Sequence, residues 1–168
     1  GRVAASWSAV RRLRALLARP SAPAAAVTAT VARAQRPTAV LFQRAAGRAD
    51  NGRALVNEAS ALKALRAAGF AAQSVSPSQL SLATLAQTLG DASLLVGIHG
   101  AALAHCMWLP AGRSSMVEAF LPDHAYGLYP LFARASGVMH LPLFLQWSHV
   151  DRRPASSMKA FRASAWAR

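Results

Sequence analysis

The chain contains a single cysteine, Cys106, among its 168 residues. One cysteine cannot form an internal disulfide bond, and its surroundings do not suggest a metal cluster. The sequence also lacks any run of about 18 strongly apolar residues, the length that a membrane-spanning helix needs, and it shows no recognisable signal peptide. We therefore expect neither a disulfide framework nor a membrane span, and the redox compartment is left open.

Acidic residues are scarce, and their positions limit what the net charge of +13 means. The first 49 residues contain nine Arg and no acid, whereas all six acids lie between residues 50 and 151, where five basic residues nearly balance them. The tail from Arg152 adds five positive charges. Basic flanks can hold polyanions or a membrane surface without specificity. No nucleic-acid recognition motif is present, so we expect no specific nucleic-acid partner.

Two common catalytic signatures are missing. The sequence has no Gly-x-Ser-x-Gly motif, so an α/β-hydrolase would lack its nucleophile. His99 and His105 are six positions apart, which places them on different faces of a helix, and the other histidines are scattered at His124, His140 and His149. We therefore predict no metal site.

Residues 38–141 contain an alternation of short apolar runs and helical patterns. The apolar runs predict strands at 38–42, 70–75, 93–97, 115–120 and 137–141, and the helical patterns predict helices at 53–68, 80–89, 104–108 and 123–136. Strands and helices that alternate with short connections predict an α/β fold, a Rossmann-like parallel sheet with helices on both faces. Such sheets bind ligands beyond the carboxyl ends of their strands.

Three parts follow from this pattern. Residues 1–36 form a basic, Ala- and Arg-rich flank, in which Val10, Leu13 and Leu16 recur at helical spacing. Residues 37–149 form the Rossmann-like lobe. Residues 150–168 form a basic tail that we expect at the periphery.

The most informative stretch is the end of the strand at 93–97, where the chain reads Gly97, Ile98, His99, Gly100, Ala101. A glycine lets the backbone approach a ligand closely, and the free N–H groups at a helix start favour a phosphate. The alternative is an ordinary tight connection with a solvent-facing histidine. The spacing alone is less specific than a dinucleotide-binding fingerprint.

Several charged residues are expected at the same edge of the sheet. Arg44 follows the first strand and Arg53 opens the next helix, and arginine suits bidentate phosphate contacts. Because 17 of the basic residues are Arg, each one alone is a weak candidate. Asn57 and Glu58 lie in the first turns of that helix, where the helix dipole alone favours an acid. Glu118 closes a strand at this edge, where its carboxylate either contacts a ribose or is a surface acid.

In combination, these residues resemble glycosyltransferase family 61, which includes EGF-domain O-GlcNAc transferases, protein O-mannose GlcNAc transferases and plant xylosyl- and arabinosyltransferases. The resemblance extends from about Val40 to Leu141. It rests on motif residues that occur in the family's order: Arg53, Asn57-Glu58, Gly69-Phe70, Gln87, Leu95-Val96-Gly97, His99-Gly100-Ala101, Leu103, Leu109-Pro110 and Val117-Glu118.

The resemblance implies the carboxyl-terminal lobe of a GT-B fold, the lobe that holds the nucleotide-sugar donor. It implies an inverting, metal-independent transferase in the lumen of the Golgi or endoplasmic reticulum, with a UDP-sugar as donor substrate and no cofactor. The other partner is a glycan or glycoprotein acceptor, and membrane association would require a segment outside this chain. The sugar, the acceptor and the linkage are not implied.

The resemblance also implies roles for matching residues. Arg44 and Arg53 are implied as contacts of the pyrophosphate or the uracil side, and Glu118 as a contact of the ribose. The pair Asn57-Glu58 either touches the ligand or braces the loop. The turn at His99 is implied as the donor-binding turn, and its members are Gly97, His99, Gly100 and Ala101.

A GT-B enzyme forms its active site between two lobes, and residues 1–37 are too few to build a second one. We therefore expect a fragment, a partial gene product or a reduced relative. His99 is the candidate catalytic base within this chain, and the missing lobe is the alternative source of the base. Two rival functions are a non-catalytic, polyanion-binding module with basic flanks and a different Rossmann-like enzyme with another phosphate ligand.

Overall fold

A computed structural model describes residues 36–43, 54–55, 57–122, 127–146, 150–155 and 158–161. The predicted helix within the flank lies outside these residues, as do Arg44 and Arg53. In chain order the elements are β1 (Thr38–Phe42), β2 (Ala54–Leu55), α2 (Glu58–Ala67), β3 (Ala71–Val75), the 3-10 helix η1 (Pro77–Gln79), α3 (Leu82–Gly90), β4 (Leu94–Ile98), the 3-10 helix η2 (Ala101–Trp108), β5 (Ser115–Phe120), α4 (Leu128–Ala135), β6 (Met139–Phe144), β7 (Val150–Ala155) and β8 (Met158–Phe161). Among the described helices, none has the length and apolar character needed to cross a membrane.

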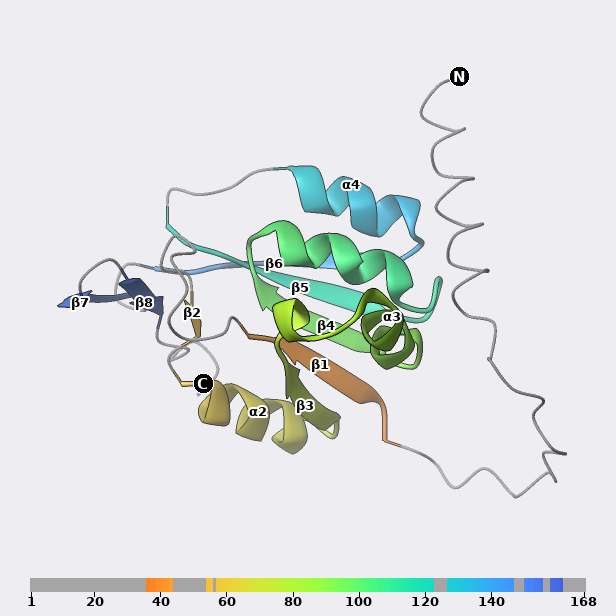
Figure 1. Ribbon diagram of the computed structural model, residues 1–168, viewed down its shortest axis with the longest axis horizontal. Helices are drawn as coiled ribbons and strands as arrows, with labels where there is room; N and C mark the ends of the chain where they lie inside the picture. The colour runs from red at the N-terminus through yellow and green to blue at the C-terminus, as the bar shows by residue number, and fades with distance from the viewer. Residues whose placement is uncertain are drawn as a thin grey trace, which may run out of the picture.

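Five strands form a sheet in the order β3-β1-β4-β5-β6, and every neighbouring pair is parallel. The chain moves outward from β1 to β3, returns past β1 to β4 and continues through β5 to β6. The order therefore reverses between β1 and β4, which is the switch point where doubly wound sheets bind ligands. Helix α2 covers one face, and α3 and α4 cover the other (Figure 1). The predicted Rossmann-like α/β fold is confirmed.

Side chains of alternate strand residues fill two cores, one on each face of the sheet. Val40 and Leu95 join the core beneath α3, η2 and α4, whereas Leu41 and Val96 join the core beneath α2. All four are at most 2% exposed, and burying such a side chain stabilises the fold by about 1.5–3 kcal/mol. The continuous apolar runs seen in the sequence reflect strands that are covered on both faces.

The helix predicted from Arg53 begins later, at Glu58. The two residues Ala54–Leu55 form β2 instead. The physical reason is the side chain of Gln43, which receives a hydrogen bond from Leu55 N (3.2 Å) and donates one to Leu55 O (2.7 Å). These bonds hold Leu55 extended, so the predicted start of the helix was wrong.

The helix expected after His99 starts at Ala101 and is a 3-10 helix over its whole length. It begins with a hydrogen bond from Leu103 N to Gly100 O (2.9 Å) and ends with one from Leu109 N to Cys106 O (3.0 Å). Runs of this type are usually shorter, because their hydrogen-bond geometry is poorer than that of an α-helix. Tertiary packing therefore supports η2, and its buried residues are Leu103, Cys106 and Trp108.

A second sheet has the order β2-β8-β7. β2 pairs in parallel with β8, and β8 pairs antiparallel with β7. In Figure 1 this small sheet lies off the carboxyl ends of the main strands. The sequence did not predict β7 and β8, because the tail is basic and because Pro154 argues against a strand.

Candidate functional site

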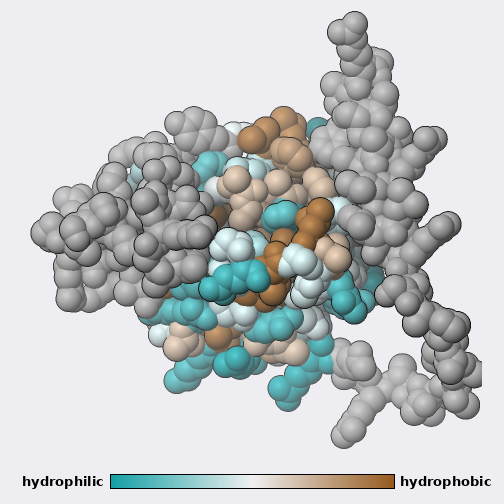
Figure 2. All heavy atoms as spheres, in the orientation of Figure 1, coloured by the Kyte–Doolittle hydropathy of each residue, from teal (hydrophilic) through white to brown (hydrophobic). Residues whose placement is uncertain are grey.

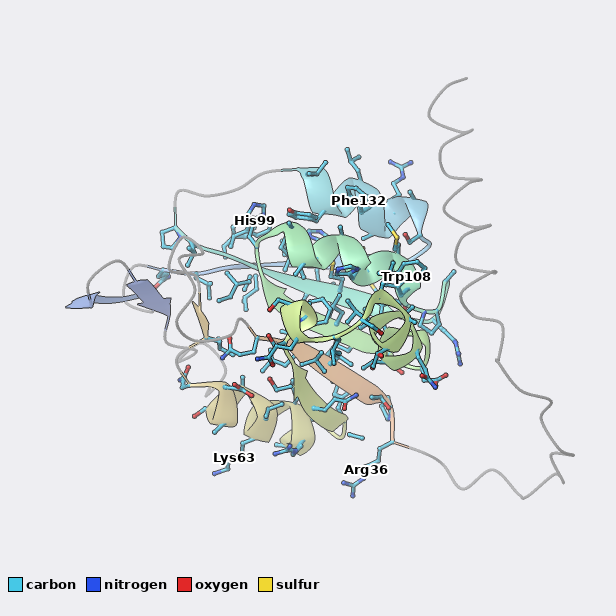
Figure 3. The ribbon with its side chains drawn as sticks, in the orientation of Figure 1. Arg36, Lys63, His99, Trp108 and Phe132 are labelled. Atoms are coloured by element: carbon cyan, nitrogen blue, oxygen red, sulfur yellow. The ribbon has the colours of Figure 1, made fainter. Side chains whose placement is uncertain are left out.

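The turn after β4 carries His99 into the interior of the protein. His99 N donates to Ala119 O of β5 (2.8 Å), so sheet pairing continues through this residue. Its ring stacks on Phe120, with centroids 5.4 Å apart, and meets the ring of Tyr129 edge-on at 5.2 Å. His99 is only 8% exposed, so the alternative of a solvent-facing histidine is wrong. Figure 3 shows His99 at the carboxyl-end side of the sheet and Trp108 at the opposite end of η2.

Glu118, on β5, is completely buried and lies between two histidines. Its Oε1 is 2.6 Å from His99 Nδ1, and its Oε2 is 2.7 Å from His140 Nε2. A buried carboxylate loses several kcal/mol of solvation unless partners replace the water, and these two short contacts supply partners for both oxygens. The alternative of a surface acid is therefore wrong.

With Glu118 ionised, the two contacts assign the proton of each ring. An ionised carboxylate can only accept, so both rings donate to Glu118. His99 is then protonated on Nδ1, and in its neutral form Nε2 holds the lone pair. His140 has the opposite tautomer, with the proton on Nε2. A buried carboxylate that holds an imidazole by its Nδ1–H is also how catalytic triads orient a general base.

The register of the sheet brings the three side chains together. Gly97 of β4 and Pro142 of β6 both pair with Glu118. Residues two positions apart along a strand share a face, so His99, two after Gly97, and His140, two before Pro142, flank the carboxylate diagonally. His140 was missed because only this pairing register reveals the contact, and the sequence does not specify register.

Two further side chains on η2 respond to this buried environment. Burial, and secondarily the charge of Glu118, raise the pKa of the Cys106 thiol to about 12. Burial lowers the pKa of His105, whose Nδ1 accepts a hydrogen bond from Trp108 Nε1 at 3.3 Å. Cys106 is thus a protonated core residue rather than a nucleophile.

A second polar cluster joins the end of β1 to the start of α2. Besides its bonds to Leu55, Gln43 Nε2 donates to Glu58 Oε2 at 3.2 Å. Of the two alternatives for Glu58, the structure shows the bracing contact. Asn57 occupies the N-cap position of α2 without a capping hydrogen bond from its side chain, and a ligand contact for either residue stays a prediction. Sequence reasoning did not single out Gln43, although a polar residue directly after a buried strand was a usable signal.

The glycines of the predicted donor turn have different structural roles. A Cβ on Gly97 would lie 2.9 Å from Leu103 Cδ2 and 3.4 Å from Phe42 Cβ, so the glycine lets Leu103 of η2 pack closely on β4. Gly100 is buried and precedes η2, and Ala101 is exposed at its start. Donor contacts of this turn stay a prediction.

The two predicted arginine contacts are not placed by the structure, but their chain neighbours are. Gln43 precedes Arg44, and Ala54 follows Arg53. Gln43 is hydrogen-bonded to Leu55. The contacts of both arginines with a donor stay predictions.

A cavity of about 610 Å³ lies at the amino ends of β5 and β6, away from the His99 turn. Ser115 and Met139, the first residues of β5 and β6, line it together with Arg113, Arg134 and His140. His140 therefore lies between this cavity and the buried Glu118. Within the described residues, no three His, Cys, Asp or Glu side chains are grouped as metal ligands.

Comparison with known protein families gives a match over most of the chain. The sequence profile of a family described as Glycosyltransferase 61 matches residues 6–117, about two-thirds of the chain. The matched segment runs through β1, the turn at His99 and the first part of β5, and it ends one residue before Glu118. A search of curated proteins found no match.

Proposed function

The chain belongs to glycosyltransferase family 61, and from this membership we propose that it binds a UDP-sugar and transfers the sugar, with inversion, to a hydroxyl group of a glycan or glycoprotein. Family membership supports sugar transfer in general. We further propose that the donor is a UDP-sugar, that the transfer inverts the anomeric configuration, and that this chain is the donor lobe of a GT-B enzyme. We also propose the Golgi or endoplasmic reticulum lumen as its compartment.

The observation that carries the donor site is the position of the His99 turn. It follows β4, which borders the point where the strand order reverses, and doubly wound sheets bind nucleotides at that point. β1, on the other side of this point, leads into Gln43 and then Arg44. Hydrogen bonds tie Gln43 to Leu55, two residues after Arg53. We propose that these arginines and the backbone N–H groups after His99 hold the diphosphate.

Arginine and backbone donors suit the leaving group of this reaction. When the bond between the sugar C1 and the diphosphate oxygen breaks, the electron pair leaves with UDP, and negative charge develops on the β-phosphate. Fixed N–H donors stabilise such charge where it develops, and a guanidinium can contact two phosphate oxygens at once. This chemistry supports transfer without a metal ion.

An inverting transfer needs one base to take the proton of the attacking hydroxyl. The acceptor oxygen forms a bond with C1 from the face opposite UDP, and its proton passes to the base. We propose His99 as that base, because its contact with Glu118 places the proton on Nδ1 and the lone pair on Nε2. A base from a second lobe is the competing source.

Exposed apolar side chains support a second lobe. Leu128 and Leu131 on α4 are 53% and 60% exposed, and Met139 and Phe144 on β6 are 60% and 67% exposed. In Figure 2 the apolar colour gathers over α4, at the top of the view. Apolar patches of this kind commonly mark contact surfaces, so we propose that another lobe of the same enzyme packs here.

Isothermal titration with UDP, with and without a chelator, tests the donor site. We expect saturable binding that the chelator does not change. Arg53→Ala should weaken it by about 1.5–3 kcal/mol, the usual effect of losing a charge-assisted hydrogen bond. Lys63→Ala is the matched control, because Lys63 lies on α2 and points away from the sheet (Figure 3). A folded chain that binds no UDP would refute the proposal.

A further inference from the structure

We propose that Glu118 and His140 are positioning residues that act through His99, holding its ring with the proton on Nδ1. The inference rests on the proposed function only for the use of His99 as a base, since the hydrogen-bonded unit itself belongs to the fold. The matched family segment ends at residue 117, so it assigns no role to either residue.

The geometry makes Glu118 the link between the two rings. Its side chain has no exposed surface, and each oxygen has its own imidazole partner at 2.6 Å and 2.7 Å. Rotation of the carboxylate about its last bond would break at least one of these contacts. His140 therefore fixes the plane of the carboxylate, and the carboxylate fixes the proton and the orientation of His99.

Aromatic packing limits the other way in which His99 could rearrange. Phe120 lies against the face of its ring, with an interplanar angle of 26°, and Tyr129 approaches at 64°. Turning the ring over would require both neighbours to move inside a packed core. The position of the proton is thus determined by Glu118 and not by rotation of the ring.

Of the three hydrogen-bonded residues His99, Glu118 and His140, His140 can be changed with the least damage to the core. It lies on β6, at the edge of the main sheet, and lines the cavity beside Arg113 and Arg134. His140→Gln keeps an N–H donor for Glu118, whereas His140→Leu has a similar bulk and no donor. The two variants therefore separate the hydrogen bond from side-chain packing.

The tautomers can be read directly by 15N NMR of the imidazole nitrogens in the whole chain, at a pH where the rings are neutral. In the unmodified protein we expect His99 protonated on Nδ1. The Glu118 carboxylate is kept in both His140 variants and can only accept, so His99 should keep its proton on Nδ1 and the variants should differ in the strength of that hydrogen bond. His140→Gln should preserve the downfield Hδ1 resonance of His99, and His140→Leu, which leaves the carboxylate free to rotate, should broaden it or shift it upfield. His99 protonated on Nε2 in the unmodified protein, or an Hδ1 resonance unchanged in His140→Leu, would overturn the proposal.

Glu118→Gln gives an independent test with nearly the same volume. An amide has one accepting oxygen and one donating NH₂ group, so it cannot accept from both rings. One of the two histidines must then change its tautomer, and thermal unfolding of the same sample shows whether it is folded. If Glu118→Gln folds and both tautomers stay as before, the proposed linkage is wrong.

UDP titration separates positioning from direct donor contact. If Glu118 and His140 act only through His99, His140→Leu and Glu118→Gln should change the Kd for UDP by no more than about twofold. A direct ribose contact by Glu118 predicts a loss of about tenfold or more in Glu118→Gln, which would overturn the positioning role. Absence of UDP binding in the unmodified protein would refute the proposed function, and the NMR result would still decide the linkage.

Discussion

Replacing Gly97 by alanine tests whether close packing, rather than a ligand, requires glycine in the turn before His99. The new Cβ would lie 2.9 Å from Leu103 Cδ2 and 3.4 Å from Phe42 Cβ. Carbon atoms in a packed core are normally about 3.5–4.0 Å apart, so Leu103 would have to move by more than half an ångström. Leu103 is 1% exposed, and packed cores contain few voids into which such a side chain could move.

Overpacking of this kind costs about 1–3 kcal/mol. For a chain of 168 residues, each kcal/mol lowers Tm by about 2–4 °C, so Gly97→Ala should lower Tm by about 2–12 °C in calorimetry. Adding Leu103→Val removes the clashing carbon and should recover part of the loss, so the two changes should not be additive. UDP affinity should stay unchanged in the folded fraction.

Gly90→Ala is the matched control. Gly90 is the last residue of α3, and a Cβ there would have no atom within 4 Å. Alanine in a helix should leave stability unchanged or raise it by about 0.4–1 kcal/mol. If Gly97→Ala is as stable as Gly90→Ala, the packing argument is wrong and the glycine has another purpose.

Two further predictions concern Cys106 and Gln43. Because the Cys106 thiol has a pKa of about 12 in the folded protein and about 8.5 when unfolded, only the unfolded chain loses its proton between these values. The free energy of unfolding should therefore fall by up to about 1.4 kcal/mol per pH unit above pH 8.5. Denaturant titrations at several pH values should show that fall in the unmodified protein and not in Cys106→Ala. An equal dependence on pH in both proteins would contradict the raised pKa of Cys106. Gln43→Leu removes the three hydrogen bonds that brace Leu55 and Glu58. It should lower the free energy of unfolding, measured with urea, by about 1–3 kcal/mol. An unchanged midpoint would show that β2 does not depend on Gln43.

The five strands of the main sheet were predictable because each one carries its own local signal. The run at 38–42 follows Pro37 and is apolar from Ala39 to Phe42, and β1 has the bounds 38–42. The run at 115–120 also coincides with β5. Both strands are buried on two faces, so composition alone distinguishes them from the polar connections around them.

Prediction failed where partners distant in sequence decide the structure. Residues 54–55 have helix-forming side chains, but hydrogen bonds from Gln43, 12 positions away from Leu55, hold the segment extended. His140 reaches Glu118 across 22 positions through the register of two strands. Local propensity cannot encode either contact, and for that reason the sequence indicated His99 and Glu118 separately but not the unit that they form with His140.

The pairing of β2 with β8 has a consequence for the timing of folding during synthesis. Among the described strands, Ala54 and Leu55 pair with Ala160 and Phe161, more than one hundred residues later in the chain. At about 5–20 residues per second, a ribosome needs roughly 5–20 s to make that stretch. The five-stranded sheet, complete at Phe144, can therefore assemble first, and the segment that follows Arg53 joins its second sheet only when β8 (Met158–Phe161) has been made.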